Sequence, residues 1–361
     1  MGQKRTPGLF KRKGIWHIDK QVNGKRICQS TGTSELKKAE EVLAKIIEEN
    51  RQAIIFGIRP KKTFDQAAAK FVLENEQKRS INSDISRLGL LIPWIGDLYI
   101  DEIHMGSLQP WIKYRRNLGR KSNTINHGLK VVRRILNLAS SEWIDENGLT
   151  WLLAAPKIKL LTVTDARKAY PLDWDEQNKL IEELPEHLVQ MAIFAVNTGC
   201  RDAEICNLRW DWEVSIPELD TVAFIIPGEY VKNREERLVV LNRIAASIVE
   251  EQRGKSLTHV FVYKGKPIAR MLNSAWTRAR NKVDLKQVRV HDLKHTFGRR
   301  LRSAGVSFED RQDLLGHRSG RITTHYSAAE LTNLIDSANT VCDGGNGKPE
   351  LVVLRRKGSG S

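Results

Sequence analysis

The sequence has few cysteines and no long apolar run, and each shortage excludes a class of protein. The 361 residues include only Cys28, Cys200, Cys206 and Cys342, with no Cys-x-x-Cys pair among them. Neither a zinc site nor a disulfide framework is therefore indicated, and a reducing cytosol fits these cysteines best. No apolar stretch approaches the roughly 20 residues that a membrane-spanning helix needs, so no membrane partner is expected.

The two ends of the sequence differ in composition from the rest of the chain. The first residues are basic and lack the apolar core of a signal peptide. We therefore expect a cytoplasmic location and not secretion. The last four residues, Gly-Ser-Gly-Ser, resemble an added linker. Between the ends there is no internal repeat and no low-complexity tract.

Positive charge is the main feature of the composition. The formal net charge is +16 and the pI is about 9.7, which indicates a polyanionic partner, nucleic acid rather than a membrane surface. A soluble basic enzyme is the plainer alternative on charge alone. Hydrophobic residues make up 40% of the chain, enough for buried cores, and the length predicts two or three domains.

Residues 1–60 are predicted to form a small basic α+β module. Apolar and polar residues alternate on both sides of Asn23-Gly24, which indicates a hairpin. Apolar residues at helical spacing then predict a helix; they are Leu36, Ala39, Leu43, Ile46 and Ile47. The module contains 13 Lys/Arg against 6 Asp/Glu, and a basic linker follows at residues 59–62. The candidate DNA-binding residues of the module are Lys11, Arg12, Lys13, Lys25 and Arg26.

Residues 63–155 are predicted to be an all-α bundle. Apolar residues recur three or four apart in four stretches separated by glycine and proline. The last stretch carries cations on the face opposite its apolar positions, where phosphates could meet them; solvated surface charge is the alternative. The candidate DNA-binding residues here are Lys121, Lys130, Arg133 and Arg134. A second basic linker precedes a mixed α/β region at residues 165–340, and residues 341–361 form a tail.

The stretch "NTGCRDAEICNLRW" is the first candidate site. Thr-Gly ends one helix, and Arg201 precedes Glu204 by three residues, on one face of the next helix. An arginine held by a carboxylate can clamp a phosphate through two hydrogen bonds. An ordinary surface ion pair between residues three apart is the alternative.

Two further positions become informative only together. Lys232 lies in the predicted turn between two strands, where a lysine can reach into a groove and give up a proton. Tyr326 follows a Leu-Gly-His element by nine residues, and a phosphate held by cations makes a tyrosine nucleophile accessible. Taken alone, each is more often a solvated turn lysine or a packing tyrosine.

"VHDLKHTFGRRLRSAG" is the most charged stretch, predicted to be helical in its second half. Three interpretations apply: a solvated basic helix, part of a phosphate site, or a metal pair of His291 and His295, which stand four apart. The metal pair lacks a third ligand at motif spacing, and no glutamate lies between the histidines as in His-Glu-x-x-His.

These stretches together resemble the tyrosine recombinase family, specifically the phage-type integrases. The resemblance covers essentially the whole chain. It rests on motifs that occur in the family's order and spacing over some 125 residues: "TGCRDAEI", Lys232 between two strands, "HDLKHTF", "LLGH" and "THYS".

The resemblance implies a role for each matched residue. Arg201 matches the first catalytic arginine and Glu204 the acidic residue that supports it. Lys232 matches the hairpin lysine that protonates the 5′-oxygen leaving group. His317 matches the histidine of the Leu-Gly-His element, and Tyr326 matches the nucleophile.

The family's His-x-x-Arg element contains the one departure. His291 matches its first residue, but Lys294 stands where the family has arginine. Lysine keeps the charge and loses the planar fork that grips two phosphate oxygens. We expect Lys294 to act as a point-charge clamp; the alternatives are weakened activity, or compensation by Arg299 or Arg300. His295 is expected to be structural.

The resemblance also implies the architecture and the partners. We expect a multidomain, mainly α chain: an arm-type DNA-binding module at 1–60, a helical core-binding domain at 63–155, and a catalytic domain of the DNA breaking–rejoining type at 165–340. The implied function is site-specific recombination that integrates and excises mobile DNA, without a metal or other cofactor. The implied partners are double-stranded core and arm-type attachment sites, a homo-tetramer on DNA and, as candidates, a host DNA-bending protein and an excisionase, in the nucleoid of a bacterial host.

Two other functions use the same residue types. A type IB topoisomerase has the same chemistry, although the arm-type module argues against it. A catalytically weak or inactive DNA-binding protein of the same fold is conceivable because of Lys294.

Overall fold

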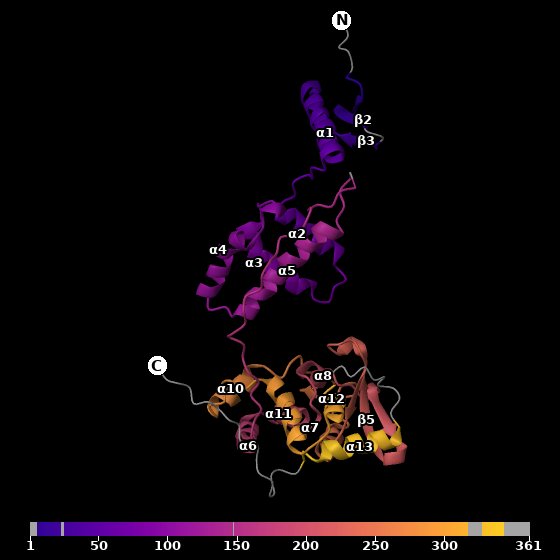
Figure 1. Cartoon of the computed structure of the whole chain (residues 1–361). Coiled ribbons are helices and arrows are strands. Elements are labelled where there is room, and N and C mark those ends of the chain that lie inside the picture. Colours follow the sequence, from indigo (N-terminus) through magenta and orange to yellow (C-terminus); the bar gives the residue numbers. More distant parts are fainter. Residues whose placement is uncertain (1–5, 23–24, 147, 317–326, 343–361) are drawn as a thin grey trace. The chain divides into compact units, whose positions relative to one another are not determined.

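The computed structural model describes residues 6–22, 25–146, 148–316 and 327–342. The chain divides into two compact units, Met1–Arg167 and Lys168–Ser361 (Figure 1). Helices make up most of the regular structure and the β-sheets have two or three strands each, which confirms the predicted mainly α architecture with small β parts. Among the described residues, none of the helices combines the length and the apolar character needed to cross a membrane.

The first unit begins with the predicted hairpin and helix. Strands β1 (Leu9–Arg12), β2 (Ile15–Val22) and β3 (Lys25–Ser30) form an antiparallel sheet in that order, and α1 (Leu36–Phe56) packs against β2. The Asn23-Gly24 turn lies outside the described residues. Alternation places Leu9 and Ile18 opposite each other in register, both buried against the apolar face of α1. Strand β1 was not predicted, because its four residues are too short for a periodic signal.

A bundle of helices forms the rest of the first unit, as predicted. Its core consists of the apolar faces of these helices, and α5 contributes most to it. Pro93 and Pro110 lie inside helices, where the sequence pattern had indicated breaks. The elements are α2 (Phe64–Glu74), α3 (Ile81–Ile95), the 3₁₀ turn η1 (Ile100–Glu102), α4 (Met105–Asn117) and α5 (Ser122–Ser141).

Both predicted linkers are fastened to neighbouring elements. Arg59 donates its Nε hydrogen to the carbonyl of Thr150 at 2.7 Å. Asn126 on α5 makes two hydrogen bonds with the backbone of Leu161, at 2.8 and 2.7 Å. These contacts satisfy backbone groups that loops otherwise leave to water, so each linker is held to the first unit, the first linker at Arg59 and the second at Leu161.

The second unit surrounds helix α7, which packs against α9 and α11. Its three-stranded antiparallel sheet has the order β4-β5-β6, and β7 and β8 form a separate small hairpin. The helices are α6 (Trp174–Glu183), α7 (Glu186–Thr198), α8 (Asp202–Cys206), α9 (Arg243–Gln252), α10 (Ser274–Lys282), α11 (Val290–Ser303), α12 (Phe308–Leu314) and α13 (Ala328–Asn339). The strands are β4 (Glu213–Ile216), β5 (Thr221–Ile226), β6 (Arg237–Val240), β7 (Val262–Tyr263) and β8 (Lys266–Pro267).

Helix α11 begins earlier than the sequence pattern indicated. It starts at Val290, so the whole charged stretch is helical and not only its second half. The fully buried Asp292 explains the early start. One of its carboxylate oxygens accepts from the backbone of Arg289 at 2.8 Å, and the other accepts from Tyr170 at 3.0 Å. The same carboxylate thus caps α11 and holds the first residues of the second unit against it.

Candidate active site

Arg201 lies at the junction of two helices. Gly199 ends α7 with φ +60°, and a Cβ there would lie 2.7 Å from Cδ1 of Phe297, so only glycine fits. Two residues later Arg201 is the N-cap of α8. Its backbone N–H donates to Glu204 Oε2 at 2.7 Å and its guanidinium to Glu204 Oε1 at 2.6 Å. The carboxylate therefore sets both the backbone and the side chain of Arg201.

Glu204 belongs to a buried charge cluster and not to a surface ion pair. Its side chain is 2% exposed, and a second arginine, Arg237 at the start of β6, also donates to its Oε2. Burial by itself raises the pKa of the Glu204 carboxyl, but Arg237 and Arg201 outweigh burial and keep the pKa below its ordinary value. Glu204 is therefore ionised, and Arg201, whose side chain is 22% exposed, is the member of the cluster open to a ligand.

Arg237 is absent from the residues predicted for the site. A signal was present: Arg237 shares the inward face of β6 with Val239, where a charged residue needs a buried partner. That partner, Glu204, is 33 residues away in sequence, so the pattern along the strand could not name it.

Lys294 is buried behind Arg201. Lys294 is 4% exposed. Its Nζ donates to the carbonyl of Gly199 at 2.7 Å and to the carbonyl of Leu315. Burial, followed by the nearby charges of Arg237 and Arg201, lowers the pKa of Lys294 to about 6. The structure thus places Lys294 beside the predicted residues but surrounds its amine with protein carbonyls.

The two alternatives for Lys294 on the same helix differ in what they contact. Arg300 donates to Gln177 at 2.9 Å, and its guanidinium lies 3.4 Å from the ring centroid of Trp174, both on α6. Arg299 is partly exposed one position earlier. Arg300 is therefore engaged with α6, which does not favour its substituting for Lys294.

His291 is exposed one turn before Lys294. Partial burial, followed by the charges of His295, Lys294 and Arg201, lowers the pKa of His291. Its ring meets that of His295 edge-to-face at 4.8 Å between centroids. Among the residues that the structure describes, no group of three His, Cys, Asp or Glu side chains has the arrangement of a metal site.

Lys232 lies between two strands, as the sequence predicted. Strands β5 and β6 are antiparallel neighbours, and the exposed Lys232 is in the connection between them. His317 and Tyr326 lie outside the described residues, which stop at Gly316 after α12 and resume at Ser327 before α13.

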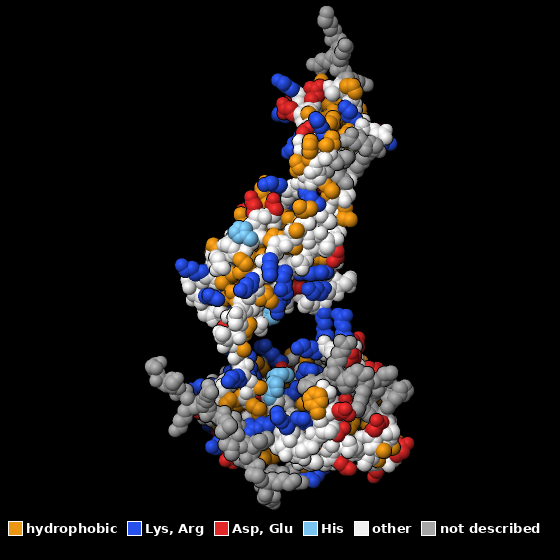
Figure 2. Space-filling model, in the orientation of Figure 1, with side chains coloured by type: hydrophobic (Ala, Val, Ile, Leu, Met, Phe, Trp, Pro, Cys, Tyr) orange, Lys and Arg blue, Asp and Glu red, His pale blue; other side chains and the backbone are white. Residues whose placement is uncertain are grey.

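The candidate DNA-binding residues are mostly exposed. On α5, Lys130, Arg133 and Arg134 lie opposite the buried apolar stripe, and Figure 2 shows Lys and Arg side chains gathered over this part of the bundle. Lys121 is exposed at the N-cap of the same helix. A cationic surface of this kind suits phosphate contacts.

The cations of the N-terminal sheet differ in their partners. Lys11, Arg12 and Lys13 are exposed at the β1–β2 connection, and Lys13 has a left-handed φ of 48°. Arg26 forms a two-point ion pair with Asp19, with both distances 2.7 Å. The side chain of Lys25 lies outside the described residues.

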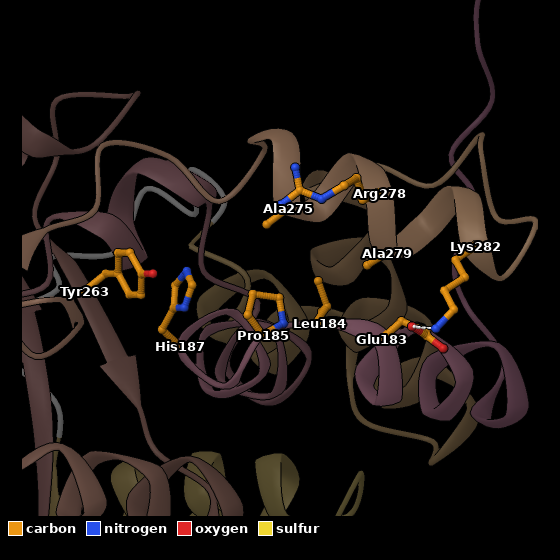
Figure 3. A pocket seen from close by; sticks show the side chains of 9 residues that line it. All are labelled: Glu183, Leu184, Pro185, His187, Tyr263, Ala275, Arg278, Ala279 and Lys282. Carbon is orange, nitrogen blue, oxygen red and sulfur yellow. Dashed lines mark hydrogen bonds and ion pairs between the residues drawn. The ribbon is translucent and has the colours of Figure 1, made fainter.

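A pocket of about 410 Å³ lies elsewhere in the second unit, between the α6–α7 connection, β7 and α10 (Figure 3). His187 and Tyr263 lie against each other at one end, with 4.1 Å between ring centroids, and Lys282 pairs with Glu183 at the other. Burial lowers the pKa of His187. The pocket shares no lining residue with the cluster around Arg201.

Comparisons with known proteins agree with this fold. A model described as the phage integrase family matches residues 171–332, and one described as the phage integrase N-terminal domain matches residues 8–49. The integrase of Salmonella phage P22 is 27% identical, over 92% of this chain and 94% of the relative. Tyrosine recombinase XerC of Xylella fastidiosa (strain M23) is 24% identical, over 70% of this chain and 87% of the relative.

Solved structures show the same fold. Lambda integrase as a dimer bound to a COC′ core site has a TM-score of 0.58 at 14% identity, covering 98% of this chain and all of that one. Lambda integrase as a tetramer bound to a Holliday junction has a TM-score of 0.55 at 14% identity, covering 90% and 99%. The family models and the relatives together identify the chain as a tyrosine recombinase. It belongs to the phage integrase family, and it is a site-specific recombinase.

Proposed function

We propose that this recombinase cleaves and rejoins DNA through a 3′-phosphotyrosyl intermediate, integrating and excising mobile DNA. The observation that carries the proposal is the Arg201–Glu204–Arg237 cluster, in which a buried, ionised carboxylate orients one partly exposed guanidinium. Such a preorganised cation stabilises charge that develops on a phosphate in the transition state.

In the proposed reaction Tyr326 is the nucleophile. Its oxygen forms a bond to the scissile phosphorus while the bond from phosphorus to the 5′-oxygen breaks, and Lys232 gives that oxygen a proton. Arg201, His291 and His317 stabilise the phosphorane electrostatically, with Lys294 behind Arg201. The 5′-hydroxyl of a partner strand then attacks the phosphotyrosine and releases the tyrosine, so the number of phosphodiester bonds is conserved and no cofactor is needed.

The proposed partner is double-stranded DNA, bound at core sites by residues 63–155 and 165–340 and at arm-type sites by residues 1–60. Lambda integrase, which has the same fold, is seen as a dimer on a core site and as a tetramer on a Holliday junction, which supports a homo-tetramer on DNA. A host DNA-bending protein and an excisionase are proposed accessory partners. We propose action at the bacterial nucleoid in the cytoplasm. Val341, the first residue of the predicted tail, is buried in a core of the second unit with Leu334 and Ala338 of α13, so a separate tail cannot begin at that residue.

The test is covalent capture on a nicked half-site, which loses the cleaved fragment and traps the intermediate. The parent chain should form an SDS-stable protein–DNA adduct in the presence of EDTA, and Tyr326→Phe should form none because it lacks the nucleophilic oxygen. Tyr263→Phe, the same change at an exposed tyrosine of the second unit, should form the adduct like the parent. An adduct that persists in Tyr326→Phe would refute the assignment.

A further inference from the structure

Two buried basic side chains from different elements donate hydrogen bonds to the same two loops. Lys294 on α11 donates to the carbonyls of Gly199 and Leu315. Arg237 on β6 donates through Nη2 to Gly199 at 3.2 Å, and also to Thr198 and Leu314, each at 3.3 Å. Each of these side chains therefore links the C-terminal end of α7 to the C-terminal end of α12.

The carbonyls that they contact need such donors. The last carbonyls of a helix have no partner within that helix, and these four lie at or just after the last residues of α7 and α12. Thr198, Gly199 and Leu314 are buried and Leu315 is partly buried, beside Arg237 and Lys294, which are 2% and 4% exposed, so water has little access to these carbonyls. The positive charge of Arg237 at these two helix C-termini is also favourable to the helix dipoles.

The two loops carry the candidate catalytic residues. The first continues from Gly199 to Arg201, and the second continues through Gly316 toward His317. Gly316 has φ +57°, and a Cβ there would lie 2.5 Å from Nε of Arg237, so the second loop approaches the guanidinium as closely as only glycine permits. Arg237 is also joined to Arg201 through their shared carboxylate, Glu204.

We propose that Lys294 and Arg237 are positioning residues that hold the 198–201 loop against the 314–316 loop, and that Lys294 acts on the scissile phosphate through Arg201 without touching it. The proposal rests on the proposed function and gives the lysine at the family's arginine position a different task from a point-charge clamp. A second guanidinium, that of Arg237, shares the Glu204 carboxylate with Arg201. The low pKa of Lys294 supports the same conclusion, since a largely neutral amine is a poor clamp for an anion.

The test compares two substrates in single-turnover cleavage. One has the ordinary scissile phosphodiester, and the other has a methylphosphonate there, in which a methyl group replaces one non-bridging oxygen and removes the negative charge. A residue that contacts that charge becomes less necessary on the neutral linkage, whereas a positioning residue is needed equally on both.

Lys294→Met and Arg237→Met should lower the maximal cleavage rate on the order of a hundredfold, with little change in the half-saturating DNA concentration. Relative to the parent, the loss should be the same on both substrates. For Arg201→Met the loss should be clearly smaller on the methylphosphonate. Lys286→Met, the same change at an exposed lysine of the second unit, should match the parent on both.

Where a methionine variant does not fold, Lys294→Gln or Arg237→Lys replaces it, since each keeps a side-chain nitrogen that can donate hydrogen bonds. Both should retain more of the cleavage rate than the corresponding methionine variant, again equally on both substrates. Relief of the Lys294 variants on the methylphosphonate, or a parent-like rate for them, would overturn the proposal. The adduct assay with Tyr326→Phe reports on the proposed function separately, because it involves neither Lys294 nor Arg237.

Discussion

Replacing Glu204 with glutamine probes the centre of the site with the loss of one charge. The carboxylate accepts from Arg201 through both the backbone and the side chain, and from the buried Arg237. Glutamine has nearly the same shape but presents an amide N–H₂ to one of the two arginines. One guanidinium then loses its acceptor and meets a donor, and Arg237 is left as a buried charge without a counter-ion.

The structure sets the size of the effect. Removing one partner of a buried ion pair costs about 3–5 kcal/mol, and Arg237 and Glu204, each 2% exposed, meet that condition. For a folding unit of this size each kcal/mol shifts Tm by about 2–4 °C, so Tm of the affected transition should fall by roughly 6–20 °C. Misplacing Arg201 by about 1 Å should also slow cleavage on the order of a hundredfold.

The assay is thermal unfolding of the full chain by circular dichroism, combined with single-turnover cleavage well below Tm. A double-mutant cycle isolates the pair: Glu204→Gln with Arg237→Met removes both charges and should be less unstable than the sum of the single variants. Glu204→Asp is the control, because it keeps the charge. A Tm within 2 °C of the parent for Glu204→Gln, or additivity in the cycle, would refute the reasoning.

Two further predictions concern protons and salt. Because the folded pKa of Lys294 lies near 6, below the ordinary lysine value of 10.5, the unfolded chain binds the extra proton between these values, and stability should rise with pH across that window by about 1.4 kcal/mol per unit. Urea unfolding at several pH values should show this rise in the parent and lose it in Lys294→Met; identical pH dependence in the two proteins would disprove it. Replacing Lys130 and Arg133 with alanine should make the slope of log affinity against log salt shallower by about 2, since each phosphate contact contributes about 0.9. Titration of core-site DNA at several salt concentrations measures the slope. Lys45→Ala on α1, where the lysine faces Glu49, is the control, and an unchanged slope in the double variant would remove α5 from the DNA-binding surface.

Local patterns were sufficient to predict most elements. The helices of the bundle, α7, and the β5–β6 pair with Lys232 between its strands follow from apolar periodicity of 3.6 or 2 residues, which records which face is buried. The Arg201–Glu204 pair also follows, because residues three apart on one helical turn are neighbours. The order of the motifs was sufficient for the family.

The tasks of Lys294 and Arg237 were decided only by the tertiary structure. The amine of Lys294 meets a carbonyl 95 residues away in sequence and another 21 residues away, and Arg237 meets a carboxylate 33 residues away. No local pattern encodes such distances, because they depend on how α7, α11, α12 and β6 pack. The sequence by itself determined that a lysine stands at the arginine position of a recombinase motif. The packed structure decided that its amine is buried, where it donates hydrogen bonds to carbonyls at the ends of two helices.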